Sequence, residues 1–228
     1  MVNNVETFAT LPHIMAKGAT WYRALGNPAT PGTKLYTVLG HINRPGLFEA
    51  PYGLTLRQII EQFGAGMRPG STCRFVLAGG AAGSLVPTTR LDVPLDYASA
   101  AQGVMLGAGA FLVCDQSVSP VMMLRELMHF FAVESCGKCT PCRMGTLRAR
   151  QILDRLVAGD PGDASLALPS RASLTRREDV GALHELAAVL EEASFCGLGQ
   201  SAAWPIKSAL QHFDRAFTVD SVNEESPQ

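Results

Sequence analysis

Long apolar runs are missing from this chain, and so is a targeting segment at its start. No stretch reaches the roughly 18 to 20 apolar residues that a transmembrane helix needs, and the opening MVNNVETFAT has neither a basic segment nor the apolar centre of a signal peptide. Excess positive charge is absent too, since the formal net charge of the 228 residues is -1, and this argues against a nucleic-acid partner. We therefore expect a globular, cytoplasmic chain without direct membrane insertion, with one large or two small domains.

Cysteine, by contrast, is well represented, with six residues. The cytosol keeps thiols reduced, so clustered thiols there favour metal binding or redox chemistry over a disulfide framework. The stretch ESCGKCTPCRMG places Cys136, Cys139 and Cys142 at two successive CxxC spacings. Cys73 and Cys114 lie in apolar, β-rich runs, and we expect both to be buried thiols that act as small hydrophobic side chains.

The spacing of apolar residues divides the chain into two parts. Between Lys34 and Asp115 the short runs KLYTVLGHI, CRFVLAGG and GAFLVCD alternate with turn signals such as NRPG and with one helical segment, LTLRQIIEQFG. This pattern predicts an α+β module. From Ser119 onward the period becomes helical, with Ser119 as N-cap and Pro120 at the first helical position. The apolar positions of this helix are Leu124, Leu127, Met128 and Phe131.

Three further helices are predicted after the cysteine stretch. The first ends at Gly159, the second opens with a capping box from Thr175 to Glu178, and the last has Pro205 in its first turn. Their apolar stripes are Met144, Leu147, Ile152, Leu153 and Leu156; Val180, Leu183, Leu186, Ala187 and Leu190; and Ile206, Leu210, Phe213 and Phe217. We expect a small helical bundle over residues 119–217 and a disordered tail over 218–228.

A fourth cysteine, Cys196, stands in the glycine-rich stretch SFCGLGQ between the last two predicted helices. An up-down arrangement of helices can place this loop at the same end as the first three cysteines. Two consecutive CxxC steps plus a distant cysteine resemble the ligation of a [4Fe-4S] cluster. Structural zinc sites usually contain two separated pairs, so the spacing favours iron-sulfur over zinc, and a cysteine cluster without metal is the third alternative.

Residues beside the cysteines have a functional and an ordinary interpretation. His129 could be a ligand or move protons, although a helical histidine is more often a surface or core residue. Positive charge on Lys138 and Arg143 would favour the reduced, more negative state of a cluster, or would merely be solvated. Three glycines would let the backbone approach a cluster closely, or would only form turns: Gly137, Gly197 and Gly199.

These motifs together carry a family resemblance. ESCGKCTPCRMGT, followed by SFCGLGQSAAWPIKSALQHF and preceded by VNNVETFATLPHI, resembles the NADH-binding flavoprotein subunit of respiratory complex I (NADH:quinone oxidoreductase) and of NAD-linked hydrogenases and formate dehydrogenases. The resemblance covers only the C-terminal part of that family. It implies a remnant of the flavin domain over residues 1–33, a β-grasp domain of the soluble ligand-binding type over 34–118, and an all-α four-helix bundle carrying one [4Fe-4S] cluster over 119–217.

By motif position, the resemblance assigns the cluster ligands to Cys136, Cys139, Cys142 and Cys196. It also assigns contacts with the FMN phosphate to Asn3, Asn4 and Thr7. The family's glycine-rich flavin and NADH segment would lie upstream of residue 1, and LAGGAAG and GLGQ lack the GxGxxG spacing of a dinucleotide site. We therefore expect FMN binding only if a flavin domain completes the pocket, and no NADH oxidation by this chain alone.

The function implied by the resemblance is electron transfer. In the family, NADH gives a hydride to FMN, and the cluster passes electrons singly from the reduced flavin to iron-sulfur centres in partner subunits. We expect such partners, a separate flavin/NADH domain among them, and a peripheral position at the inner face of the membrane through these subunits. The β-grasp domain would be structural or a docking surface. The alternative is a non-redox binding module with a zinc-stapled helical bundle.

Overall fold

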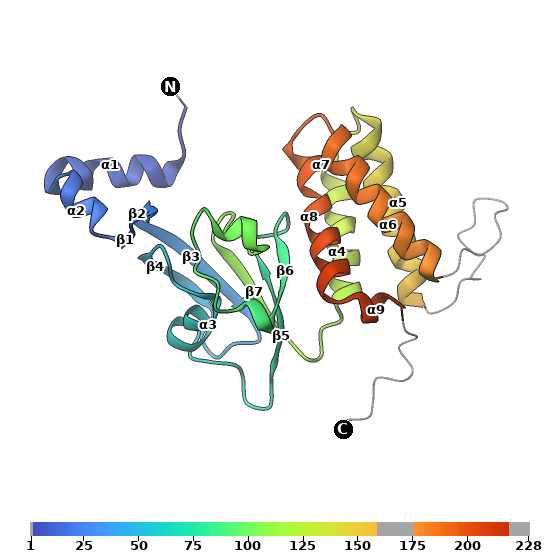
Figure 1. Ribbon diagram of the computed structural model, residues 1–228, viewed down its shortest axis with the longest axis horizontal. Helices are drawn as coiled ribbons and strands as arrows, with labels where there is room; N and C mark the ends of the chain where they lie inside the picture. Colours follow the sequence, from blue (N-terminus) through green and yellow to red (C-terminus); the bar gives the residue numbers. More distant parts are fainter. Residues whose placement is uncertain (1, 159–175, 219–228) are drawn as a thin grey trace. The chain divides into compact units, whose positions relative to one another are not determined.

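The computed structural model describes residues 2–158 and 176–218, and the chain divides into two compact units. The division falls after Asp115, with Ala81–Leu85 grouped with the second unit. The first unit combines helices and strands and the second consists mainly of helices (Figure 1), so the predicted mixture of helix and sheet is confirmed. In the part of the chain that the structure describes, no helix is both long and apolar enough to cross a membrane.

The first unit opens with two helices and two short strands. These elements are α1 (Val5–Lys17), α2 (Ala19–Arg23), β1 (Gly26–Asn27) and β2 (Thr30–Pro31). The side chain of Asn4 caps α1 by accepting a hydrogen bond from the Glu6 amide at 2.8 Å. Glu6 in turn accepts hydrogen bonds from Lys34 Nζ at 2.7 Å and from the Leu35 amide at 3.0 Å. Because α1 buries none of its residues, these polar contacts hold its first turn beside the sheet.

A five-stranded sheet forms the centre of the first unit, in the order β4-β3-β7-β5-β6. Its strands are β3 (Thr33–Gly40), β4 (Gly46–Pro51), β5 (Cys73–Ala78), β6 (Ser84–Pro87) and β7 (Ala110–Asp115). β3 runs parallel to β7 and antiparallel to β4, and β5 runs antiparallel to β7. The three strands predicted from the sequence are β3, β5 and β7, so β4 and β6 were missed.

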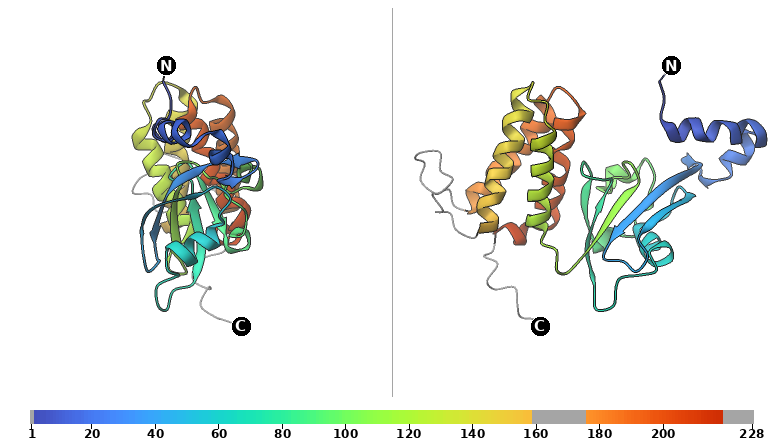
Figure 2. Two further views of the ribbon diagram at one scale, coloured as in Figure 1. Left: turned by 90° about the vertical axis from the view of Figure 1, so that its left-hand side faces the viewer. Right: turned by 180° about the vertical axis from the view of Figure 1, so that it is seen from behind.

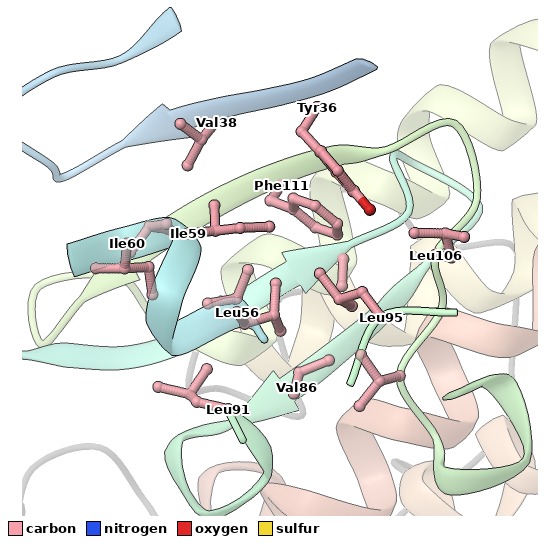
Figure 3. Close-up of a cluster of buried hydrophobic side chains, with 14 of the residues drawn as sticks. Tyr36, Val38, Leu56, Ile59, Ile60, Val86, Leu91, Leu95, Leu106 and Phe111 are labelled. Carbon is pink, nitrogen blue, oxygen red and sulfur yellow. The ribbon is translucent and has the colours of Figure 1, made fainter. Parts of the chain in front are cut away.

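The core of the first unit lies on one face of this sheet. Thr55 and Gln58 form a capping box that opens α3 (Leu56–Gln58), which continues as a π-helical turn over Ile59–Phe63. This helical segment covers the face that carries Tyr36 and Phe111 (Figure 3). The short 3-10 helices η2 (Thr88–Arg90) and η3 (Ser99–Gln102) complete the unit.

Two cysteines lie in the sheet, and both were expected to be buried. Cys114 of β7 is buried, as predicted, but Cys73 of β5 is only half-buried. Burial raises the pKa of Cys73 to about 11 and the pKa of Cys114 to about 12. Both thiols are therefore protonated near neutral pH and behave as small apolar side chains.

The second unit packs four longer helices around an apolar centre. Its helices are α4 (Pro120–Glu134), α5 (Thr140–Ala158), α6 (Arg176–Ala193), α7 (Gly197–Ser201), α8 (Ala203–His212) and α9 (Asp214–Thr218). α4 packs against α5 and α8, and α6 packs against the same two helices (Figure 2). Ser119 caps α4 by accepting from the Met122 amide, and Pro120 occupies the first helical position, as predicted.

The helical predictions need two corrections. Met144 and Leu147 were expected in the buried stripe of α5, but they are 51% and 39% exposed and line an open apolar groove with Leu186 and Val189. The predicted last helix is two helices, because Phe213 leaves the helical region at φ -133° and ψ 31° between α8 and α9. The predicted capping residue Thr175 lies outside the described residues. The predicted tail over 218–228 also lies outside them, except for Thr218, which is the last residue of α9.

Tyr36 provides a test of the sheet core. It is fully buried, and no described residue bonds to its hydroxyl group; burial raises its pKa to about 12. An unsatisfied buried hydroxyl costs about 1–3 kcal/mol, so Tyr36→Phe should leave the free energy of unfolding unchanged or raise it. Equilibrium urea unfolding at pH 7 measures the effect. Tyr36→Ala, the control, should lose about 3–5 kcal/mol with its ring packing, and a clear loss in Tyr36→Phe would reveal a hydroxyl partner.

Candidate metal centre

The loop between α4 and α5 carries Cys136 and Cys139, and the first turn of α5 carries Cys142, the third predicted ligand. Residues 135–142 are called the first cysteine loop below. Gly137 has φ +76°, a left-handed conformation that glycine adopts at no steric cost, and there it reverses the chain. Cys139 directly precedes α5, and its carbonyl accepts a hydrogen bond from the Arg143 amide at 3.0 Å. The first of the three thiols is exposed and the other two are buried: Cys136, Cys139 and Cys142.

The fourth predicted ligand, Cys196, is exposed and lies in the loop between α6 and α7. It has an extended backbone, with φ -144° and ψ 170°, and directly precedes α7. The Gln200 side-chain amide donates to the Ser194 carbonyl at 3.0 Å, which ties the end of this loop to α7. Both cysteine loops lie at the same end of the helical unit (Figures 1 and 2).

Atomic contacts join the two loops. A Cβ atom placed on Gly199 would lie 2.9 Å from Cys142 Cβ and nearer still to Ser194 Oγ, closer than real Cβ atoms come. Only glycine therefore permits this approach. Phe195, the neighbour of Cys196, also directs its amide toward the Cys139 thiol. The segments that hold all four predicted ligands thus meet at one place.

The surroundings of Cys139 favour its thiolate form. Backbone N–H groups, first that of Phe195 and then that of Cys142, lower the pKa of the Cys139 thiol, and the positive charge of Arg143 acts in the same direction. The residue also stands at the start of the long helix α5, where the helix dipole stabilises negative charge. Because the thiolate is the form that binds metals, Cys139 is prepared for that role.

Arg143 fixes a positive charge across the first cysteine loop. Its guanidinium group donates to the Gly137 carbonyl and, at 3.3 Å, to the Thr140 hydroxyl. Arg143 is exposed, and so are Lys138 and His129, the other two charged or titratable residues singled out in the sequence. Of these three residues, Arg143 is the one that these hydrogen bonds tie to the loop.

Two serine hydroxyl groups near the cysteines were not predicted from the sequence. The Ser135 hydroxyl lies 3.3 Å from Cys142 Sγ and accepts a hydrogen bond from the Gly137 amide at 3.3 Å. The Ser194 side chain is buried at the contact between the loops. The available signal was the placement of a serine one or two residues before a cysteine in both stretches, ESC and SFC.

The donor set suits a soft metal centre. Thiolate ligands select zinc or iron-sulfur clusters among the common biological metals. Within residues 2–158 and 176–218, no three Cys, His, Asp or Glu side chains are gathered closely enough to hold a single ion. In a [4Fe-4S] cluster the four cysteines surround a cube instead of sharing one ion. The converging loops, the close approach at Gly199 and the buried Ser194 hydroxyl fit such a group.

The residues predicted to contact FMN lie in the first unit, at the first turn of α1. Asn3, Asn4 and Thr7 are all exposed. The side-chain oxygen of Asn4 is used for capping, and Asn3 Oδ1 accepts from the Asn4 amide at 2.8 Å. The structure places these three residues together, and their role toward FMN stays a prediction.

Two known protein families match separate parts of the chain. Residues 122–220 match the family described as the NADH-ubiquinone oxidoreductase-F iron-sulfur binding region. Residues 35–86 match the family described as the SLBB domain. The first match contains all four of the cysteines whose segments converge.

Individual relatives cover nearly the whole chain. The F-type subunit of NADH-quinone oxidoreductase from Mycobacterium tuberculosis (strain ATCC 25618 / H37Rv) is 40% identical over 93% of this chain and 45% of that protein. The NADP-reducing hydrogenase subunit HndC of Solidesulfovibrio fructosivorans is 35% identical over 100% of this chain and 44% of the relative. A crystal structure of an NAD+-reducing [NiFe]-hydrogenase in the H2-reduced state superposes with a TM-score of 0.80 and 33% identity, over 95% of this chain and 34% of that chain. This chain therefore spans about half the length of the curated relatives it matches.

The contact at Gly199 can be tested by adding one methyl group. Gly199→Ala should push the two cysteine loops apart, since overpacking typically costs about 1–3 kcal/mol, and should lower the iron bound per chain after anaerobic reconstitution. Gly181→Ala is the matched control, because this glycine of α6 has no described atom within 4 Å of its added Cβ. Equal iron contents in the two variants would show that the approach at Gly199 does not shape the site.

Proposed function

We propose that this chain is the iron-sulfur electron-transfer portion of an NAD(P)H-linked oxidoreductase. The premise is that the chain is a relative of the C-terminal part of the F-type subunit of NADH-quinone oxidoreductase. In this proposal it passes electrons one at a time from reduced FMN to clusters in partner subunits. The observation that carries the proposal is the meeting of two cysteine loops through Gly199.

The proposed ligands are the four cysteines of the two loops, which bind one [4Fe-4S] cluster: Cys136, Cys139, Cys142 and Cys196. When bound, the cluster supplies a site that accepts and releases one electron. The chain's own residues orient and stabilise it. Backbone amides and Arg143 favour the Cys139 thiolate, and the Ser135 hydroxyl contacts the Cys142 sulfur.

The domain organisation belongs to the same proposal. The SLBB-domain match over residues 35–86 and the one-sided packing of α3 on the sheet support a β-grasp domain over 34–118. The mutual packing of α4, α5, α6 and α8 supports a four-helix bundle over 119–217. Residues 1–33 would then be the end of a flavin domain and its connection.

The flavin contacts and the partners are proposed from the relatives. A helix N-terminus favours a phosphate group, which supports FMN-phosphate contacts from Asn3, Asn4 and Thr7 at the start of α1 once a flavin domain completes the pocket. Relatives named as subunits of NADH-quinone oxidoreductase and of NADP-reducing hydrogenase support other subunits as partners. Through such subunits the chain would lie peripherally at the inner face of the membrane.

The ligand assignment predicts a simple pattern of metal loading. Anaerobic reconstitution of the full chain should give about four iron and four sulfide ions per chain. Serine at any one of the four proposed ligands should abolish or convert the cluster, because a hydroxyl group is a poor iron ligand beside thiolates. Cys73→Ser and Cys114→Ser are the controls and should load normally. Stoichiometric zinc without iron uptake would instead support the alternative of a zinc-stapled, non-redox binding module.

Arg143 should raise the reduction potential of the cluster. Arg143→Gln removes a positive charge that stabilises the reduced, more negative state, so the midpoint potential should fall. Arg143→Lys keeps the charge and should retain most of the potential. A redox titration followed by electron paramagnetic resonance (EPR) makes the measurement.

Lys138→Gln is the matched control for that titration. Lys138 and Arg143 are both exposed, but hydrogen bonds hold the charge of Arg143 at the loop, so we expect a smaller fall in midpoint potential from Lys138→Gln. A potential that stays unchanged in Arg143→Gln would assign Arg143 to loop structure alone.

A further inference from the structure

Ser194 holds a buried hydroxyl group without a protein partner. The residue is 5% exposed, and no described residue bonds to its Oγ atom. Leaving a buried hydroxyl unsatisfied destabilises the fold, and the large majority of buried side-chain polar atoms in proteins are hydrogen-bonded. The position therefore calls for an acceptor that the described protein atoms do not supply.

The hydroxyl is held at the contact between the two cysteine loops. Ser194 Oγ and Cys142 Cβ both lie under 3.0 Å from the same point, the place that a Gly199 Cβ would occupy. The Ser194 backbone is fixed as well, because its carbonyl accepts a hydrogen bond from the Gln200 side chain at 3.0 Å. The hydroxyl group therefore lies beside Cys142, and its residue stands two positions before Cys196.

A cluster bound by the neighbouring cysteines would supply the missing acceptor. Thiolate and sulfide sulfur atoms of an iron-sulfur cluster accept hydrogen bonds, and such bonds help to set its reduction potential. Ser135 already lies 3.3 Å from Cys142 Sγ. We propose that Ser194 donates a hydroxyl hydrogen bond to a sulfur atom of the bound cluster, and thereby raises its reduction potential.

This inference rests on the proposed function, because it needs the cluster that the four cysteines would bind. The donated hydrogen bond strengthens as the sulfur becomes more negative, so it favours the reduced state. Ser194 acts as a positioning residue, and it carries no electron itself. Its removal should lower the potential without removing a ligand.

The test is a redox titration of the reconstituted full chain, followed by EPR. Ser194→Ala should still bind iron, but its equilibrium constant for one-electron reduction should fall by about threefold to tenfold, given the energy of a hydrogen bond; a tenfold fall corresponds to about 59 mV. Ser194→Thr keeps the hydroxyl group and should restore the wild-type potential. Ser208→Ala is the matched control, since this buried serine of α8 donates within its own helix to the Trp204 carbonyl, and it should not change the potential.

The iron-free chain separates this role from a purely structural one. Without a cluster the Ser194 hydroxyl has no acceptor, so Ser194→Ala should not lower the unfolding temperature of the iron-free protein. A wild-type potential in Ser194→Ala would overturn the inference. If Ser194→Ala lost its iron, failure of Ser194→Thr to restore iron and potential would overturn it too. Absence of iron in the wild-type chain would instead contradict the proposed function.

Discussion

The candidate site depends on one close contact, the approach of α7 to the first cysteine loop at Gly199. A single Cβ atom there would collide with Cys142 and Ser194. The contact is made by backbone and by short side chains. It brings Cys196 to the same end of the helical unit as the other three proposed ligands. The packing of α6 against α5 and α8 determines where the second loop returns. The fold of the second unit is therefore the means by which cysteines far apart in the sequence meet.

Cysteine serves two purposes in this chain, and the surroundings of each cysteine decide which of them it serves. In the sheet, burial raises the pKa values of Cys73 and Cys114 and keeps them as neutral apolar groups. In the cysteine loop, backbone amides and Arg143 lower the pKa of Cys139. Hydroxyl groups of Ser135 and Ser194 add hydrogen-bonding capacity near the sulfur atoms. This contrast separates packing thiols from thiols suited to a metal centre.

The sequence predicted the mixed fold, the helix that begins at Pro120 and the family resemblance, because each rests on local patterns. It missed β4 and β6, since β4 is largely exposed and β6 has four residues, too few for a clear alternation. Periodicity also assigned Met144 to the core, although the apolar stripe of α5 is wider than the surface that its neighbours cover. The role of Ser194 was not predictable, because it depends on contacts between loops that are distant in sequence.

In the proposed function, the converging cysteine loops hold one cluster that accepts a single electron. Low-temperature EPR of the anaerobically reconstituted chain, recorded before and after reduction by dithionite, measures this property. We expect a silent oxidised state and, on reduction, an iron-sulfur signal that integrates to about one spin per chain, as expected for one [4Fe-4S] cluster. A reduced sample with no signal, from a chain that holds zinc in place of iron, would contradict the proposed function.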